Sequence, residues 1–533
     1  MQRRKLIKLA GAAVPSALFA SSADATINLL KYRALVPEIF RPIPRPPTYT
    51  PALIIGSGFG GSITAMRLAQ AGIKTTILER GSRWPTDPWR EIFTNEAFPD
   101  GRGYWHRTHT KQLTGVISLF DYFGGVLDVT TYDHIDVWRA ACVGGGSKVF
   151  TGVMIQPEKK YFDAVFKNSV SFEEMNRVYY PRVRQMLRLS PMPADVYNAG
   201  PFGHCRVWDD HVRKAGYAPT AVDSLFNWDV VRAELRGAAR KSAIVGETDL
   251  GNANGAKFDL TQNYLKFAEA TGRAQTYPGH EVRNVWYDGI RYNVDVVKLS
   301  PEGSQIDRYV LTCDYLFLAA GSIGTSELLV RARAFNHIPN LNEHVGQGWG
   351  TNGDASVLRS FGALKGITQA SPCPSRISDS SGMALTLENW GTPGLPVNLG
   401  LSASLGMVYD ERNRASFVYD ASRDRVNLLW PKGGNDDAVA ALRRVNNRIA
   451  LSSFTIPGAF PVVEDVNASF TAHPLGGAVI GKATDGYGRV KGSRRLYVVD
   501  GALIPGSTGT VNPSLTISAL VERNVEAILR DDF

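Results

Sequence analysis

The sequence is poor in cysteine, with four among its 533 residues: Cys142, Cys205, Cys313 and Cys373. They form no Cys-x-x-Cys pair and show no spacing typical of metal ligands. Four cysteines in a chain of this length also do not build a disulfide framework. We therefore expect buried free thiols, and we expect no metal site.

The chain also lacks long apolar runs, internal repeats and low-complexity tracts. No run beyond the N-terminal segment is long enough to span a bilayer. The formal net charge is +9, but no basic stripe is interleaved with aromatic residues, which disfavours nucleic-acid binding. The charge leaves open a transient contact with an anionic membrane surface, although a basic surface in solution is the simpler interpretation.

Residues 1–25 have the order of an export signal. Paired arginines, Arg3 and Arg4, precede an apolar stretch at 9–20, and Ala23-Asp-Ala25 suits a signal peptidase. The arginine pair resembles a twin-arginine signal, which carries proteins already folded around a cofactor. We expect a secreted or periplasmic protein. A short amphipathic tail is the alternative.

The segment 51–79 predicts a dinucleotide-binding unit. An apolar run, 52–55, ends at Gly56-x-Gly58-x-x-Gly61, and the helical pattern 62–71 and a second apolar run, 75–78, follow. Gly56 permits the tight turn, Gly58 lets a pyrophosphate approach the backbone, and Gly61 lets the helix pack close to the strand. The helix N-terminus offers free N–H groups to the phosphates. Glu79, 18 residues after Gly61, is placed to bind a ribose.

Two later stretches return to this pattern. The strand-like run 315–320 enters a glycine turn at 321–324, and the strand-like run 496–499 leads to Asp500-Gly501 and a helix at 513–529. The nucleotide domain is therefore predicted to be discontinuous. Between its pieces, strand-like segments such as the hairpin 416–430 indicate an antiparallel sheet that walls a substrate cavity. Residues 82–140 show no clear periodicity, and we expect connecting loops there.

A second glycine-rich stretch, Val143-Gly-Gly-Gly-Ser147, permits a backbone to pass close to a flat or charged ligand. Taken alone, it is more typical of a surface turn.

Taken together, these residues resemble the glucose–methanol–choline (GMC) oxidoreductases, and among them the non-covalent bacterial cholesterol oxidases. The matching stretches run in order through most of the chain: 56–61 with Glu79, 143–147, 315–324, 339–342, 417–421, 473–477, 481–485, 511–513 and 522–525.

The resemblance implies an α/β fold (α+β overall), with a Rossmann-like domain that binds FAD non-covalently and a discontinuous substrate domain on an antiparallel sheet. We assign 26–90, 245–345 and 466–533 to the first domain, and 91–244 and 346–465 to the second. It also implies these cofactor-binding residues: Gly56, Gly58, Phe59, Gly60, Gly61, Glu79, Gly144, Gly145, Gly146, Ser147, Val282, Gly321, Asp500, Gly501, Asn512, Pro513 and Ser514.

The resemblance further implies three catalytic residues. His473, followed by Pro-Leu-Gly-Gly, matches a histidine that faces the substrate hydroxyl; it accepts the proton or only orients the hydroxyl. Asn512 matches an asparagine that contacts substrate and flavin, with a turn residue as the alternative. Glu388 matches a carboxylate that isomerises the product, and an apolar pocket would raise its pKa. An exposed hairpin glutamate is the alternative for Glu388.

By the same resemblance, the expected reaction is oxidation of a 3β-hydroxysteroid by molecular oxygen, in which cholesterol gives cholest-4-en-3-one and hydrogen peroxide. We expect a monomer.

Three departures from the family pattern are Phe150-Thr151 for Asn-Gly, Ser514 for an aromatic residue and Ala478 for a cysteine. The first two bear on oxygen reactivity. A dehydrogenase with a quinone or protein acceptor remains an alternative, followed by an NAD-dependent dehydrogenase and a steroid carrier.

Overall fold

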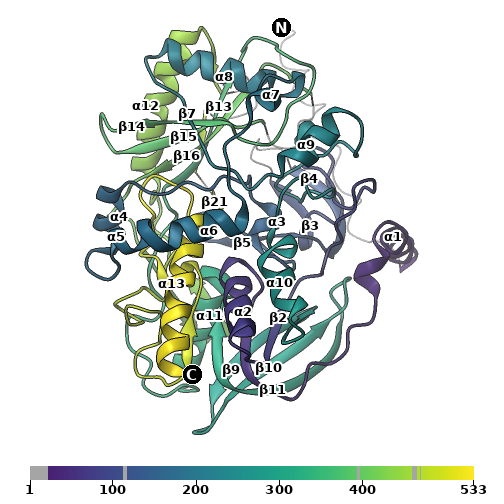
Figure 1. Ribbon diagram of the computed structural model, residues 1–533, viewed down its shortest axis with the longest axis vertical. Coiled ribbons are helices and arrows are strands. Elements are labelled where there is room, and N and C mark those ends of the chain that lie inside the picture. The colour runs from purple at the N-terminus through teal and green to yellow at the C-terminus, as the bar shows by residue number, and fades with distance from the viewer. Residues whose placement is uncertain (1–21, 112–116, 393–396, 459–464, 469) are drawn as a thin grey trace, which may run out of the picture.

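The computed structural model describes residues 22–111, 117–392, 397–458, 465–468 and 470–533. Residues 1–21, which hold most of the predicted export signal, lie outside this set. The chain builds two large sheets that occupy opposite ends of the molecule (Figure 1).

The first sheet has seven strands and is mainly parallel. Strands β8, β2, β1 and β11 lie side by side in this order, and β10 and β9 follow antiparallel to β11. The short β22 extends the parallel part beside β11. The bounds are β1 Tyr49–Ile55, β2 Thr75–Glu79, β8 Ala274–Pro278, β9 His280–Tyr287, β10 Tyr292–Leu299, β11 Gln305–Leu318 and β22 Leu496–Val498.

Helices cover this sheet because its central strands are buried on both faces. Helix α2, Phe59–Gln70, contacts both α10, Tyr264–Ala270, and α13, Ser514–Asp532. Helix α11, Gly321–Ala334, packs against β9. A nearly continuous apolar run in β1 and β2 is typical of such a buried parallel sheet. The carboxyl ends of these strands open onto the loops that form the site.

The second sheet is antiparallel. Its order is β19-β13-β16-β15-β14-β7, with β20 beside β13. Helices α12 and α8 pack together, and α12 covers β13 and β16. The bounds are β7 Thr220–Ala221, β13 Asp354–Ser360, β14 Ser375–Asp379, β15 Leu385–Glu388, β16 Ser402–Val408, β19 Ile456–Pro457, β20 Val466–Asn467, α8 Gly203–Lys214 and α12 Asp436–Ser453.

Three small sheets and several short helices complete the described chain. The small sheets pair β3 with β4, β5 with β6 and β21, and β12 with β17 and β18. Their strands are β3 Trp105–Lys111, β4 Ile117–Gly124, β5 Leu127–Tyr132, β6 Ile135–Ala140, β12 Gln347–Trp349, β17 Ala415–Asp420, β18 Arg425–Leu428 and β21 Phe470–Thr471. The remaining helices are α1 Ser22–Leu35, α3 Gly146–Val149, α4 Lys159–Phe166, α5 Phe172–Glu174, α6 Tyr180–Leu187, α7 Ala194–Tyr197 and α9 Trp228–Leu235, with short 3₁₀ or π turns at 37–40, 175–179, 200–202, 243–245, 260–262 and 501–503.

The predicted fold class is confirmed, and two local expectations need correction. Residues 82–140 carry four strands, β3 to β6, rather than connecting loops alone. The strand-like run predicted at 315–320 is the end of a longer strand, β11, which begins at Gln305. The predicted hairpin is present as β17 and β18. All four cysteines are buried free thiols, as expected. The domain boundaries stay a prediction.

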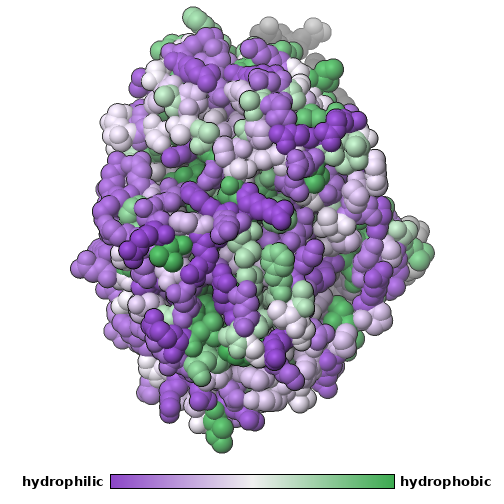
Figure 2. Space-filling view, in the orientation of Figure 1, coloured by the Kyte–Doolittle hydropathy of each residue, from purple (hydrophilic) through white to green (hydrophobic). Residues whose placement is uncertain are grey.

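The face of the molecule in Figure 2 is mostly hydrophilic, with hydrophobic residues in small scattered groups. Within the described ranges, no helix combines the length and the apolar character that crossing a bilayer requires.

Candidate active site

The first glycine turn lies where β1 ends and α2 begins. Gly58 is the N-cap of α2, and a Cβ placed on it would meet only the Gly145 backbone, 3.8 Å away. Gly56 has a φ of 101°, which favours glycine, and a Cβ there would lie 2.2 Å from the carbonyl oxygen of Ala319. The turn thus packs tightly on β11 and leaves the backbone at Gly58 open toward a ligand.

Glu79, at the end of β2, faces this turn. Its Oε2 accepts hydrogen bonds from the backbone N–H (3.1 Å) and the hydroxyl (2.7 Å) of Ser57, and its Oε1 accepts one from the N–H of Gly81 (3.0 Å). Burial raises the pKa of Glu79, and these donors oppose the rise. A carboxylate keeps acceptor sites beyond three bonds, so Glu79 can still bind a ribose hydroxyl.

The second glycine stretch is fastened to the first. The N–H of Gly144 donates to the Ser57 hydroxyl (3.2 Å), and a Cβ on Gly145 would lie 2.5 Å from the Cα of Gly58. The Ser147 hydroxyl donates to the carbonyl of Gly144 (2.7 Å) and accepts from the N–H of Leu260 (3.1 Å), so it is occupied by the protein itself. The two predicted cofactor loops therefore form one continuous cradle, and the surface-turn alternative is wrong.

A third loop closes the cradle from the C-terminal part of the chain. Oδ2 of Asp500 accepts hydrogen bonds from the N–H of Gly321 (2.9 Å) and the hydroxyl of Thr325 (2.5 Å), and Oδ1 accepts one from the N–H of Ala502 (2.8 Å). Burial raises the pKa of Asp500 to about 6. These bonds tie the start of α11 to the loop that leads into α13.

One cavity of about 810 Å³ connects the three loops with the antiparallel sheet. Most of the predicted cofactor residues line it, whereas Gly61, Gly144 and Ser147 do not. The predicted residues on its wall are Gly56, Gly58, Phe59, Gly60, Glu79, Gly145, Gly146, Val282, Gly321, Asp500, Gly501, Asn512, Pro513 and Ser514, with the catalytic candidate His473.

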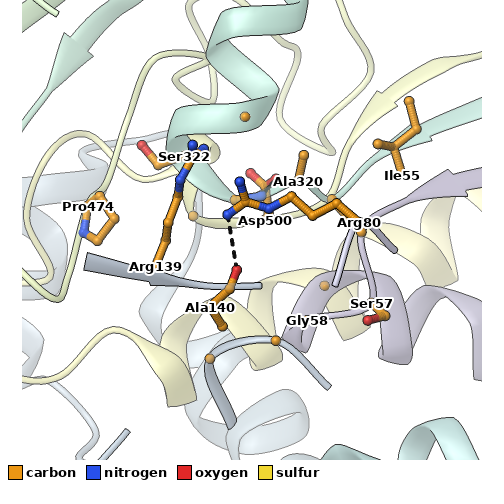
Figure 3. A pocket seen from close by; sticks show the side chains of 18 of the residues that line it. Ile55, Ser57, Gly58, Arg80, Arg139, Ala140, Ala320, Ser322, Pro474 and Asp500 are labelled. Atoms are coloured by element: carbon orange, nitrogen blue, oxygen red, sulfur yellow. Dashed lines mark hydrogen bonds between the residues drawn. The ribbon is translucent and has the colours of Figure 1, made fainter. Parts of the chain in front are cut away.

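Two arginines that the sequence analysis did not select enter this cavity. Figure 3 shows Arg80, which follows β2, and Arg139, on β6, extending toward each other between Gly58 and Ser322. Both guanidinium groups contact Oδ2 of Asp128 at 2.8 Å, and Arg80 also donates to the carbonyl of Ala140 (3.3 Å). Their positive charge beside the glycine cradle suits the phosphates of a dinucleotide.

His473 follows β21 and is held from behind by Asp354, the first residue of β13. Its Nδ1 lies 2.8 Å from Oδ1 of Asp354, and its backbone N–H donates to Oδ2 (3.1 Å). The Asp354 side chain is fully buried. Burial by itself lowers the pKa of His473, but the charge and hydrogen bond of Asp354, together with the charge of Glu388, raise it above its usual value. Nε2 remains available to the cavity.

Glu388 is the last residue of β15 and has no exposed surface. The described residue closest to pairing with its carboxylate is Asn512, whose side chain lowers the pKa of Glu388 through a hydrogen bond. Burial raises its pKa to about 7, while His473, Asn512 and Arg376 oppose the rise. Glu388 is therefore not the exposed hairpin residue considered above. It is absent from the described residues that form the cavity wall and lies behind it, beside His473 and Asn512.

Asn512 precedes α13 and completes the group. It lines the cavity, and its Oδ1 is buried with no partner in the part of the chain that the structure describes. A buried unpaired acceptor is costly unless a ligand satisfies it. The turn-residue alternative does not explain this atom. The structure thus brings His473, Glu388 and Asn512 together from three segments separated by 85 and 39 residues.

The cradle fits FAD. The cavity offers the groups that a dinucleotide requires. The open backbone at Gly58, the two arginines and the N-termini of α2 and α13 suit the phosphates, and the acidic residue Glu79 suits the ribose. No group of three or more potential metal ligands occurs among the residues described. Asp354 and Arg139 were not predicted, because no spacing in the sequence connects them with the motifs; Arg80 follows Glu79 directly, and that adjacency was the signal available for it.

Comparison with known proteins supports this assignment. Residues 418–520 match the family model described as GMC oxidoreductase. The chain is 25% identical to a cholesterol oxidase of Acinetobacter baumannii (89% of this chain, 94% of that protein), and 28% identical to one of Mycobacterium tuberculosis (88% and 89%).

Two solved structures share the fold. Pyridoxine 4-oxidase from Mesorbium loti superposes with a TM-score of 0.60 at 15% identity, covering 90% of this chain and 99% of that one. An FAD-dependent oxidoreductase from Chaetomium thermophilum gives 0.58 at 14% identity, covering 91% and 99%. The predicted resemblance to the GMC oxidoreductases, and to cholesterol oxidases among them, is confirmed. An oxidoreductase of this type implies FAD as the cofactor.

Proposed function

We propose that this protein is an exported, FAD-dependent oxidase of 3β-hydroxysteroids that also isomerises its first product. The convergence of His473, Glu388 and Asn512 beside a dinucleotide cradle carries the proposal. His473 and Asn512 supply a proton acceptor and an amide on the cavity wall, and Glu388 supplies a second acid–base group directly behind them. The predicted export signal and the similarity to cholesterol oxidases support the remaining parts.

The substrate part of the cavity suits an apolar ring system. Its walls beyond the catalytic group include Trp138, Trp390, Leu405 and Phe470. Burial of apolar surface contributes about 25 cal/mol per Å², so a sterol gains affinity from contact with these side chains.

His473 acts on the hydroxyl that is oxidised. The alcohol proton moves to Nε2 as the C3 hydrogen leaves as hydride, and the resulting imidazolium is stabilised by the carboxylate of Asp354. Asn512 orients the substrate oxygen. FAD held in the cradle would supply the hydride acceptor and the transfer of two electrons to oxygen that gives hydrogen peroxide. We propose that the cofactor is held without a covalent bond and that the enzyme is a monomer.

Glu388 carries the isomerisation. Its carboxylate takes a proton from C4 of the 5-ene-3-ketone and returns it to C6, so that the double bond moves into conjugation with the ketone. A pKa of about 7 suits both steps, because the group gains and loses a proton with little cost near neutral pH.

The test is to mix the purified protein with cholesterol in the absence of oxygen and then to admit air. The flavin absorption at about 450 nm is recorded throughout. Bleaching with rapid recovery and peroxide formation supports the proposal. Bleaching without recovery makes the protein a dehydrogenase with another acceptor. Phe150 and Ser514, which line the cavity where the family pattern differs, are the residues that favour this second candidate. No bleaching overturns the steroid assignment.

A further inference from the structure

A small second cavity of about 10 Å³ adjoins the large one. The two share Thr151, Asp249 and Trp390 on their walls. A volume of this size holds about one water molecule or one hydroxyl group. It is therefore a side pocket of the substrate cavity that suits one small polar group.

Asp249 is the charged residue of this side pocket. Its side chain is 7% exposed, and among the described residues only burial and the charge of Lys257 act on its carboxylate, with no hydrogen-bond donor. Its backbone N–H donates to Glu96 (3.0 Å), which fixes the position of the residue. Burial raises the pKa of Asp249, and the charge of Lys257 lowers it. Asp249 lines both cavities.

Two further buried polar groups of the side pocket are unpaired. Nε1 of Trp390 and Oγ1 of Thr392 have no hydrogen-bond partner among the residues that the structure describes. Trp390 is 7% and Thr392 5% exposed. The backbone N–H of Thr392 is held by the side chain of Gln369 (3.0 Å), so the segment is positioned by other contacts. An indole N–H and a hydroxyl without partners among the described residues, and a carboxylate, thus belong to residues that line one pocket.

The side pocket is displaced from the reacting end of the cavity. Trp390 lies two residues beyond Glu388, pairs with Ala403 of the next strand and faces the cavity. Successive residues in a strand advance about 3.3 Å, which places the backbone of Trp390 roughly 7 Å along the chain from that of Glu388.

We propose that Asp249, Trp390 and Thr392 bind a second hydroxyl group of the substrate, away from the hydroxyl that is oxidised. A hydroxyl donates to a carboxylate and accepts from an indole N–H at the same time, which satisfies the two strongest unpaired groups. A substrate without this hydroxyl leaves them unpaired, and enzymes discriminate strongly at such sites. The inference rests on the proposed function and narrows the substrate class to dihydroxylated steroids.

The test compares a 3β-hydroxysteroid with analogues that carry a second hydroxyl on ring C or ring D. We expect at least one analogue to be favoured in kcat/KM by about tenfold or more. The preference should shrink toward unity in Asp249→Asn, Trp390→Phe and Thr392→Val. Thr276→Val is the matched control, because the Thr276 hydroxyl is also buried and unpaired among described residues but lies on β8, outside both cavities. The control should keep the preference.

A binding measurement separates this inference from the proposed function. Paired 3-ketosteroids, with and without the second hydroxyl, lack the oxidised hydroxyl and are titrated against the flavin spectrum of the holoenzyme. Tighter binding of the hydroxylated ketone, lost in Asp249→Asn and Thr392→Val, supports the subsite whatever the reaction proves to be. Equal binding of the two ketones in the parent protein overturns it and means that the side pocket holds only water. Failure of every 3β-hydroxysteroid to bleach the flavin overturns the proposed function instead.

Discussion

Nδ1 of His473 lies 2.8 Å from Oδ1 of Asp354, a carboxylate with no exposed surface. The hydroxyl of Thr471 (2.9 Å) and the N–H of Ala472 (3.0 Å) donate to the other oxygen of Asp354. These bonds fix the carboxylate, and the carboxylate fixes the imidazole with Nε2 toward the cavity. The pair therefore both orients His473 and stabilises its protonated form.

Asp354→Asn should shift the pH dependence of flavin reduction. Asparagine can keep the hydrogen bond to Nδ1 but removes the negative charge that raises the pKa of His473. Since the free base must accept the alcohol proton, kcat/KM rises with pH through this pKa, and the rise should move to lower pH in the variant. The maximal rate should fall by about 10- to 100-fold, because the imidazolium loses its counter-charge. Anaerobic stopped-flow measurements between pH 5 and 9 check this.

The surface variant Asp229→Asn is the control, because the Asp229 side chain is 90% exposed. It should retain the parent profile. A profile of Asp354→Asn that coincides with the parent, at equal FAD content, would remove Asp354 from proton transfer.

Glu388→Gln should separate oxidation from isomerisation. Glutamine keeps the shape of the buried side chain but cannot take the C4 proton, so the 5-ene-3-ketone should accumulate while peroxide still forms. In the parent, isomerisation should increase as the pH rises through about 7, because the ionised carboxylate is the acceptor. Product analysis by ultraviolet absorption of the conjugated enone follows both effects.

Glu343→Gln, whose side chain is 81% exposed, serves as the control for Glu388→Gln. If Glu388→Gln still yields the conjugated enone at the parent rate, another group moves the proton and the role given to Glu388 is wrong.

The parts of the fold that follow from local chemistry could be predicted from the sequence. The predicted strand at 52–55, helix at 62–71 and strand at 75–78 correspond to β1, α2 and β2. The spacing of glycines and the apolar runs determine the type of each of these elements, and its bounds to within a few residues. Strands β3 to β6 were not predicted, because β4 is largely exposed and its side chains lack regular alternation.

The parts of the site that depend on distant pairing could not be predicted. Asp354 and His473 are 119 residues apart and meet only when β13 and β21 pack together. Whether Glu388 is exposed or buried depends on the sheet and on α13, which the local sequence does not specify. The position of Asp249 on the cavity wall likewise depends on the folded chain and could not be predicted from the residues around it.

Lys148→Met should destabilise the second glycine loop. Lys148 Nζ lies 2.8 Å from Oδ2 of Asp259, and both side chains are 2% exposed. Loss of one partner leaves a buried charge unpaired, which costs about 3–5 kcal/mol. The control is Lys159→Met, since the ion pair of Lys159 with Asp163 is exposed to solvent and contributes little to stability. Equal unfolding free energies of the two variants in urea would contradict this.

Gly61→Ala should reduce both stability and FAD retention. A Cβ at Gly61 would lie 2.0 Å from the carbonyl oxygen of Gly56, so α2 can pack on the turn only if residue 61 has no side chain. Pushing the helix away costs about 1–3 kcal/mol or more and moves the N–H groups of α2 from the phosphates. Thermal unfolding and flavin absorption after gel filtration measure the two effects. Gly200→Ala is the matched control, because a Cβ there meets no atom within 4 Å of the described structure. Retention of the parent melting temperature and flavin content by Gly61→Ala would show that close packing of α2 on the turn does not hold the cofactor, and the cradle would then depend on the Gly58–Gly145 contact instead.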